Sequence, residues 1–279
     1  MRGHLERVRV EGGPSLALVP TMGALHEGHL SLVRIALGRS DLVAVSIFVN
    51  PMQFGPGEDF AKYPRDIESD LDLLSDEGVG IVFAPESDAE LYHEGFCTSV
   101  ACRSLVEDRL CGRFRPGHFE GVATVCTVLF MMFRPDIAVF GQKDAQQLAL
   151  VRRIAKDLRL GVEVVAGPIV RETDGLAMSS RNRYLSAEER RQAPAIYRGL
   201  ARAGELAAGG ETRSRVLLEG ARSVIEAGGD LIRLQYLELV DPMTMETMRE
   251  LDREGLLAVA AHVGPTRLID NALLTPAPR

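Results

Sequence analysis

Short apolar runs that alternate with amphipathic stretches constrain the fold of this 279-residue chain most strongly. Five runs rich in Val, Ile and Leu lie at residues 16–19, 42–49, 79–84, 136–140 and 162–170. Stretches with helical spacing lie between them, at Leu30–Leu37, Asp66–Leu74, Gly121–Phe133 and Gln146–Leu158. Continuous apolar strands separated by helices are typical of a parallel sheet that is covered on both faces. We therefore expect an α/β fold with a Rossmann-like parallel sheet.

The pattern changes near Val170, which suggests a second domain. A loop with glycine and serine leads to helical segments rich in Ala, Arg and Glu, the first of which carries a capping box of Ser186 and Glu189. Three apolar runs follow, at 233–242, 256–263 and 266–274, and they predict a small sheet. The chain is thus expected to divide into a Rossmann-like domain at 1–169 and a smaller α+β domain at 170–279.

Composition narrows the class of protein. The chain is 46% hydrophobic and carries a net charge of −7, which argues against a nucleic-acid-binding surface. The charged N-terminal segment does not resemble a signal peptide, and the longest apolar segment, Val122–Phe133, is too short to cross a bilayer. The four cysteines lack paired spacing and are interpreted as reduced thiols in buried packing. These features predict a soluble, cytoplasmic protein with neither a membrane nor a nucleic-acid partner.

The segment LVPTMGALHEGH, which follows the first strand, predicts a nucleotide site. It reads as a strand end, a glycine turn and a helix whose first turn carries His26 and His29 on one face. Unpaired N–H groups and the helix dipole favour an anion there, and imidazoles add donors for phosphate oxygens. The HxxH spacing alone more often marks two surface histidines, and a metal pair would lack its third ligand. The preceding strand and turn favour phosphate.

Two further loops carry side chains suited to phosphates. GQKD follows the fourth run, where Lys143 supplies a mobile cation and Asp144 could accept from a ribose hydroxyl or orient the lysine. AMSSRNR pairs two hydroxyls with Arg181 and Arg183, which suits a triphosphate. The alternative for GQKD is a solvated turn at the end of a strand, and the alternative for AMSSRNR is a polar linker between domains.

Two other motifs concern the substrate side. In NPMQF, Gln53 stands at a strand end, where its amide can donate and accept for a small polar substrate. The acidic helix beyond it reads mostly as a solvated face, although Asp70 could reach a magnesium ion through water. In RPGH, Arg115 and His118 either line the pocket or form a turn with a satisfied histidine.

Taken together, these motifs resemble one family along nearly the whole chain. In order they are PTMGALHEGH, VSIFVNPMQF, YPR, RPGHFEGV, PDIAVFGQKDAQQ, VRETDGLAMSSRNRYLS, YLELVDP and TRLIDN. They resemble the pantoate–β-alanine ligase (pantothenate synthetase) family of the HIGH-signature nucleotidyltransferases. The resemblance implies that ATP and (R)-pantoate form pantoyl adenylate with release of pyrophosphate. The amine of β-alanine then attacks, giving pantothenate and AMP. It also implies Mg²⁺ and a homodimer.

The resemblance assigns roles residue by residue. His29 matches the catalytic position, and His26, Lys143 and Arg181 join it in stabilising charge that develops during transfer. Gln53 matches the residue that holds pantoate and lies near β-alanine, and Gln147 matches a second pantoate residue. The positions that match ATP-binding elements are Met22, Gly23, Ala24, Leu25, His26, Glu27, Gly28, His29, Gly141, Gln142, Lys143, Asp144, Val170, Met178, Ser179, Ser180 and Arg181. The smaller domain is expected to close over ATP through the MSSR loop.

Two departures from the family pattern and three rival functions stand beside this interpretation. Family members usually carry a short strand and a fuller helix before PTMG, whereas this chain begins about where that helix does, and Ser69 stands beside Asp70 where an acid is common. An adenylyltransferase for a phosphorylated substrate would need a second anion pocket, whereas Gln53 and Gln147 are neutral. The short length and negative charge disfavour a tRNA synthetase. A nucleotide-binding regulator without catalysis would not be expected to retain His29, Lys143, Ser179, Ser180 and Arg181 together.

Overall fold

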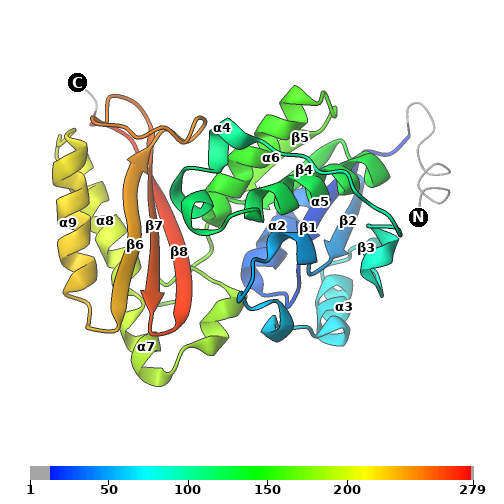
Figure 1. Cartoon of the computed structure of the whole chain (residues 1–279), viewed down its shortest axis with the longest axis horizontal. Coiled ribbons are helices and arrows are strands. Elements are labelled where there is room, and N and C mark those ends of the chain that lie inside the picture. Colours follow the sequence, from blue (N-terminus) through cyan, green and yellow to red (C-terminus); the bar gives the residue numbers. More distant parts are fainter. Residues whose placement is uncertain (1–12, 278–279) are drawn as a thin grey trace. The chain divides into compact units, whose positions relative to one another are not determined.

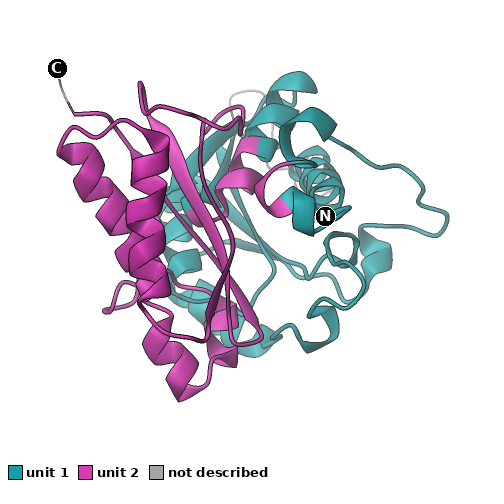
Figure 2. Cartoon of the chain, turned by 60° about the vertical axis from the view of Figure 1, so that its left-hand side comes forward, with its two compact units in different colours: residues 1–108, 112–142, 150–168 teal, residues 109–111, 143–149, 169–279 magenta. Residues whose placement is uncertain are grey.

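The computed structural model describes residues 13–277, which divide into two compact units. Unit 1 runs to Asp108 and adds Gly112–Gln142 and Leu150–Pro168. Unit 2 contains Arg109–Cys111, Lys143–Ala149 and the chain from Ile169 onward (Figure 2). The residues that precede PTMG, on which one departure from the family pattern rests, lie largely outside the described part of the chain.

Unit 1 is built on the predicted parallel sheet (Figure 1). Its five strands are β1 (Leu16–Thr21), β2 (Leu42–Ile47), β3 (Ile81–Phe83), β4 (Ile137–Gly141) and β5 (Glu163–Gly167). They pair in the order β3-β2-β1-β4-β5, and every pair is parallel. The strand order reverses between β1 and β4, and open α/β sheets bind ligands at the carboxyl ends of the strands that flank such a switch point. PTMG spans the end of β1 and GQ spans the end of β4, so the predicted motifs stand at that place.

Pro20 ends the pairing of β1 with β4 before either strand ends. The two strands pair at Ala17 with Ile137 and at Leu18 with Ala138, although β1 continues to Thr21 and β4 to Gly141. Leu16 bonds through its N–H and C=O to Asp136, at the entry to β4, and Thr21 accepts from Phe48, which follows β2. Because the bonding direction alternates along a strand, residue 20 faces β4, and proline has no N–H to offer there. At the switch point, β1 and β4 therefore stop pairing before their carboxyl ends.

The helices of unit 1 cover both faces of this sheet. They are α2 (Glu27–Leu37), α3 (Ile67–Asp76), α4 (Arg103–Val106), α5 (His118–Phe133) and α6 (Ala145–Asp157), of which α6 begins in unit 2. Helix α2 packs against β1, β2, β4 and β5, and its buried residues join those of the strands in one core. Helix α5 is buried along most of its length, as its apolar sequence predicts.

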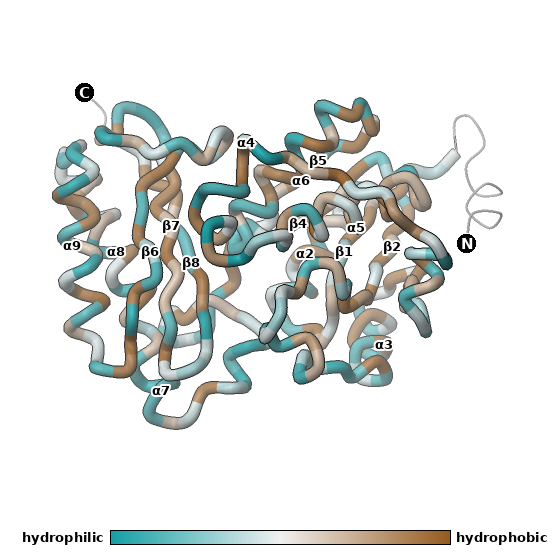
Figure 3. Tube along the Cα trace, viewed as in Figure 1, coloured by the Kyte–Doolittle hydropathy of each residue, from teal (hydrophilic) through white to brown (hydrophobic). Residues whose placement is uncertain are grey.

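Unit 2 contains the predicted small sheet and three helices. Strands β6 (Ile232–Val240), β7 (Gly255–Val263) and β8 (Thr266–Leu274) are antiparallel and pair in that order. Helices α8 (Ala195–Ala208) and α9 (Ser214–Glu226) pack on the sheet, and α7 (Ala187–Gln192) begins with the predicted capping box. Apolar residues follow β7 along most of its length (Figure 3), and those of β7 and α8 meet in the core of this unit.

Two predictions about composition can be compared with the structure. Cys111 and Cys126 are buried, as expected, and Cys102 is partly buried, but Cys97 is exposed, so the prediction of buried packing is wrong for that thiol. Cys97 lies in a segment without regular secondary structure. Among residues 13–277, no helix combines the length and the apolar character that crossing a membrane requires.

Candidate active site

The turn after β1 is held in place by two side chains from the segment 63–70. Gly23 has φ of +66°, a conformation that disfavours a side chain, and a Cβ there would lie 2.5 Å from Oδ2 of Asp70. The Leu25 N–H donates to Oδ1 of Asp70 at 2.6 Å, and the Tyr63 hydroxyl donates to the Gly23 carbonyl at 3.1 Å. Asp70 is 2% exposed, so it does not belong to the solvated face that its acidic helix suggests. The structure shows a supporting contact for Asp70, and its predicted link to magnesium stays a prediction.

His26 and His29 form a stacked pair at the start of α2. Their ring centroids are 4.0 Å apart, as the i,i+3 spacing predicts. His26, however, is the N-cap residue rather than part of the first turn: its Nδ1 accepts from the Gly28 N–H at 3.2 Å. Nδ1 of His29 accepts from the His26 N–H at 3.3 Å, which completes a capping box. The two imidazoles thus accept hydrogen bonds from backbone N–H groups that were expected to bind an anion.

This capping fixes which ring nitrogen can serve a ligand. A nitrogen that accepts a hydrogen bond carries no proton, so the proton of each neutral ring lies on Nε2. The backbone therefore holds both imidazoles in one tautomer at the start of this helix.

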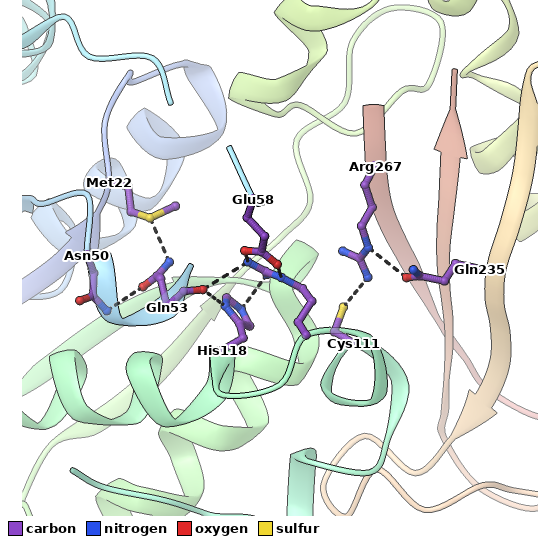
Figure 4. A network of polar contacts seen from close by, with 9 residues as sticks. Met22, Asn50, Gln53, Glu58, Cys111, His118, Gln235 and Arg267 are labelled. Carbon is purple, nitrogen blue, oxygen red and sulfur yellow. Dashed lines mark hydrogen bonds and ion pairs between the residues drawn. The ribbon is translucent and has the colours of Figure 1, made fainter. Parts of the chain in front are cut away.

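Gln53 lies beside the turn that follows β1. It ends the short 3-10 helix Pro51–Gln53 and is 8% exposed. Its Nε2 donates to Sδ of Met22 at 3.0 Å, and its Oε1 accepts from Nδ2 of Asn50 at 3.1 Å (Figure 4). The fold thus brings Gln53 next to Met22, two residues that the sequence analysis placed on the pantoate and ATP sides.

Asn50 was not singled out from the sequence, yet it organises this region. Its Nδ2 also donates to the Gly121 carbonyl at 3.1 Å, and its Oδ1 accepts from the Met52 N–H and from the Tyr92 hydroxyl. Helix α5 comes so close here that a Cβ on Gly121 would lie 2.3 Å from the Met52 carbonyl oxygen. The position of Asn50, directly after an apolar strand and before a proline, is the signal that could have identified it as an N-cap.

Arg115 and His118 lie in a turn where the histidine is hydrogen-bonded within the protein, which is one of the two alternatives predicted for them. Arg115 makes two hydrogen bonds to the Glu58 carboxylate, at 2.7 and 2.6 Å, and lies 2.9 Å from Nε2 of His118. Nδ1 of His118 lies 2.8 Å from the Gln53 carbonyl oxygen, and Figure 4 shows His118 next to Gln53. Since arginine can only donate, Nε2 of His118 accepts and its Nδ1–H donates to Gln53. The cluster therefore supports the backbone of Gln53.

In the GQKD motif, Gly141 ends β4 and Gln142–Asp144 form a 3-10 turn that leads into α6; Lys143 and Asp144 belong to unit 2. Nζ of Lys143 lies 4.0 Å from the Asp144 carboxylate, so the pair that the sequence predicts is present. The Lys143 carbonyl accepts from Nδ2 of Asn271 at 2.9 Å. Gln147 is half-buried in the first turn of α6, next to Gln146, which is engaged with the backbone of Arg109 and Cys111.

The MSSR motif follows a small hairpin. The Met178 N–H donates to the Val170 carbonyl at 3.0 Å, and Arg171 pairs with Ala177 in an isolated antiparallel bridge. Ser179 then caps the 3-10 helix Ser180–Tyr184 by accepting from the Arg181 N–H. The segment that the sequence analysis weighed as a polar linker is thus ordered by its own backbone bonds.

Comparison with known proteins identifies the family. A family model described as pantoate-beta-alanine ligase matches residues 1–273. The pantothenate synthetase of Thermoanaerobacter sp. strain X514 is 52% identical over 94% of this chain and 91% of its own length, and that of Acidobacterium capsulatum is 54% identical over 96% and 88%. The crystal structure of pantothenate synthetase from Thermus thermophilus aligns over 99% of this chain and 98% of its own, with a TM-score of 0.93 and 43% identity.

A second solved structure shows ligands that a relative binds. The pantoate-beta-alanine ligase of Francisella tularensis, crystallised with a β,γ-ATP compound and β-alanine, aligns over 97% of this chain and 93% of its own. Its TM-score is 0.79 and its identity 30%. A family match over almost the full length, relatives that are half identical and a shared fold agree: the chain belongs to the pantoate–β-alanine ligase family.

Proposed function

We propose that this chain is an ATP-dependent ligase that condenses (R)-pantoate with β-alanine to give pantothenate, AMP and pyrophosphate. The observation that carries the proposal is the stacked His26–His29 pair that caps α2, the helix that follows β1. Membership of the family supplies the substrates, and relatives that are about half identical carry the name pantothenate synthetase.

The proposed reaction has two steps, and in each of them positioning and electrostatics dominate. A pantoate carboxylate oxygen first bonds to the α-phosphorus of ATP as the bond to the departing pyrophosphate breaks. The β-alanine nitrogen then bonds to the acyl carbon, AMP leaves with its oxygen, and the nitrogen loses a proton to water. His26, His29, Lys143 and Arg181 are assigned to the negative charge that grows on phosphate oxygens in the first step.

The substrate side is assigned to neutral amides. Gln53 is proposed to hold pantoate and to lie near β-alanine, and Gln147 to hold pantoate. An amide can donate to a carboxylate and accept from a hydroxyl without leaving an unpaired charge when the ligand is absent. The remaining assigned ATP contacts are made by Met22–Gly28, Gly141, Gln142, Asp144, Val170 and Met178–Ser180.

Magnesium is proposed as part of the substrate, MgATP. Among the described residues, no group of three His, Cys, Asp or Glu side chains is arranged to hold a metal ion. Asp70 is buried against the Leu25 N–H. Mg²⁺ characteristically keeps waters and binds phosphate oxygens with few protein ligands, which suits this donor set. A homodimer in the cytoplasm and a closing movement of residues 170–279 are proposed on the family resemblance alone, and light scattering and X-ray scattering with and without ATP would test the dimer and the movement.

A pyrophosphate-release assay tests the function. Purified protein with ATP and Mg²⁺ should release pyrophosphate only when pantoate is added, and should form AMP and pantothenate once β-alanine is present. Release that does not depend on pantoate would refute the proposal and favour another nucleotidyltransferase. His29→Ala and Lys143→Ala should each slow the first step by roughly 10²–10³-fold, the scale of a lost transition-state donor. Near-normal rates in a folded variant would remove that residue from its role.

A further inference from the structure

A charged pair inside unit 2 has no role in the reaction described above. The Arg171 guanidinium donates to both carboxylate oxygens of Asp270, at 2.6 and 3.0 Å, and Asp270 is 4% exposed. Alternation along β8 places Asp270 in line with Leu268 and Leu274, which belong to the apolar core. A buried ion pair is weak evidence for stability, because apolar residues of similar volume often stabilise a core equally well. A positional role explains the pair better.

Arg171 fastens the hairpin that precedes the MSSR motif. Besides Asp270, it donates to the Gly175 carbonyl at 3.1 Å and to the Asn271 carbonyl at 3.4 Å. Its guanidinium also lies over the Tyr197 ring, 4.1 Å from the centroid. Arg171 thereby ties the base of the hairpin to β8 and the segment near its tip to that base, and Met178 at the end of the hairpin leads directly to Ser179–Arg181.

The neighbouring residue on β8 fastens the other ATP-binding element of this unit. Asn271 is 3% exposed, and its Nδ2 donates to the Lys143 carbonyl at 2.9 Å. Its own N–H donates to Oδ1 of Asp270 at 2.7 Å, which joins the two anchors. Two consecutive residues of one strand therefore contact the segments that carry Lys143 and Arg181, although 38 positions separate those two residues in the sequence.

We propose that Arg171, Asp270 and Asn271 are positioning residues that set Lys143 and Ser179–Arg181 for the phosphates of ATP. The inference rests on the proposed function for the identity of the ligand. Most residues of the motifs TRLIDN and VRETDGLAM have no assigned part in the reaction. The inference gives both motifs the same role, which is to hold the cationic and hydroxyl-bearing elements of unit 2 to β8.

A double-mutant cycle between Asn271→Ala and Lys143→Ala tests the first anchor. Asn271→Ala removes the donor to the Lys143 carbonyl and keeps the ion pair. We expect it to lower kcat/KM for ATP in pyrophosphate release by about tenfold in the parent protein, and by less than about twofold when Lys143 is already alanine. An equal loss in both backgrounds would mean that Asn271 acts independently of Lys143 and would overturn the inference for this anchor.

A second cycle, between Arg171→Lys and Arg181→Ala, tests the hairpin. Lysine keeps a positive charge beside Asp270 but loses the planar fork that reaches three acceptors. We expect Arg171→Lys to lower kcat/KM for ATP by about tenfold in the parent protein and by less in the Arg181→Ala background. Equal losses in both backgrounds would overturn the inference for the hairpin. Arg253→Lys is the matched control, because Arg253 makes an exposed ion pair with Asp241 in the same unit. It should stay within about twofold of the parent.

Calorimetric binding of ATP separates this inference from the proposed function, because it requires no turnover. Asn271→Ala and Arg171→Lys should weaken ATP binding by about tenfold and adenosine binding by less than about twofold, since the anchored residues serve the phosphates. Equal weakening of both ligands, with an unchanged melting temperature, would refute the inference. A wild-type protein that binds ATP but makes no pantothenate would refute the proposed function alone.

Discussion

A methyl group added at Gly121 would show how closely helix α5 controls the position of Gln53. A Cβ at this residue would lie 2.3 Å from the Met52 carbonyl oxygen and 2.6 Å from the Gln53 nitrogen. Both are backbone atoms, so no side-chain rotation can relieve the overlap. Ordinary contact begins near 3.4 Å, so the segment that carries Gln53 must move by about 1 Å. Gly121→Ala therefore displaces Gln53, the residue proposed to hold pantoate, without altering any side chain assigned to the reaction.

The size of the effect follows from this displacement. A misplacement of about 1 Å in a substrate-positioning residue costs roughly 10²-fold in rate, so kcat/KM for pantoate should fall by about that factor. Overpacking costs about 1–3 kcal/mol of unfolding free energy. The better helix propensity of alanine returns up to about 1 kcal/mol. The net loss of stability should be about 1–2 kcal/mol, which leaves the protein folded at room temperature.

Pyrophosphate release at varied pantoate and a thermal melt would measure the two effects. The matched control is Gly204→Ala in helix α8, where the nearest atom to a new Cβ is Cδ2 of Leu274 at 3.9 Å. That variant should keep its rate and melt at the same or a higher temperature. If Gly121→Ala stays within about threefold of the parent rate, the close packing of α5 does not determine where Gln53 lies, and the reasoning fails.

Two further predictions concern His26 and Glu58. His26→Asn keeps an acceptor for the Gly28 N–H and loses the Nε2–H donor, so the melting temperature should hold while the first step slows by about 10²-fold. A lowered melting temperature with a normal rate would mean that His26 only caps the helix. Burial raises the pKa of the Glu58 carboxyl, but the hydrogen bonds and charge of Arg115 outweigh it and hold that pKa below its usual 4.5. The pair then stabilises the fold above that pH and loses this effect as the pH falls and the carboxylate is protonated. Urea unfolding at pH 7 and at about pH 4 should show a smaller difference for Glu58→Gln than for the parent, and an equal difference would contradict the assignment.

The sheet and the histidine pair were predictable because their signals are local. Strands buried on both faces give continuous apolar runs, and these runs matched all five strands of unit 1. The strand, glycine turn and HxxH spacing lie within about a dozen consecutive residues, so their geometry follows from backbone rules. What the pattern did not show is that His26 is the N-cap, because serine, threonine, aspartate and asparagine are the residues that normally mark one.

The supporting contacts were not predictable, because each joins residues far apart in the chain. Asp70 accepts from Leu25, 45 positions away, and Asp270 pairs with Arg171 across 99 positions. In the acidic stretch DIESDLDLL, one buried carboxylate is hidden among exposed ones. Its only local mark is the i,i+4 spacing to Leu74, the other buried residue of α3. Neither pair leaves a periodicity that a single sequence can reveal.

The PTMGALH segment shows how backbone rules alone can prepare a site for an anion. Pro20 has no N–H and ends the ladder between β1 and β4. Gly23 turns the chain at a positive φ that leaves room for the Asp70 carboxylate. His26 and His29 then complete the helix start with their Nδ1 atoms, which places the proton of each neutral ring on Nε2. Pro20 acts through the N–H that it lacks, Gly23 through the Cβ that it lacks, and the two histidines through ring nitrogens bound to the backbone. The two imidazoles are therefore oriented by the backbone itself, and such preorganisation is what the proposed electrostatic stabilisation of a departing pyrophosphate requires.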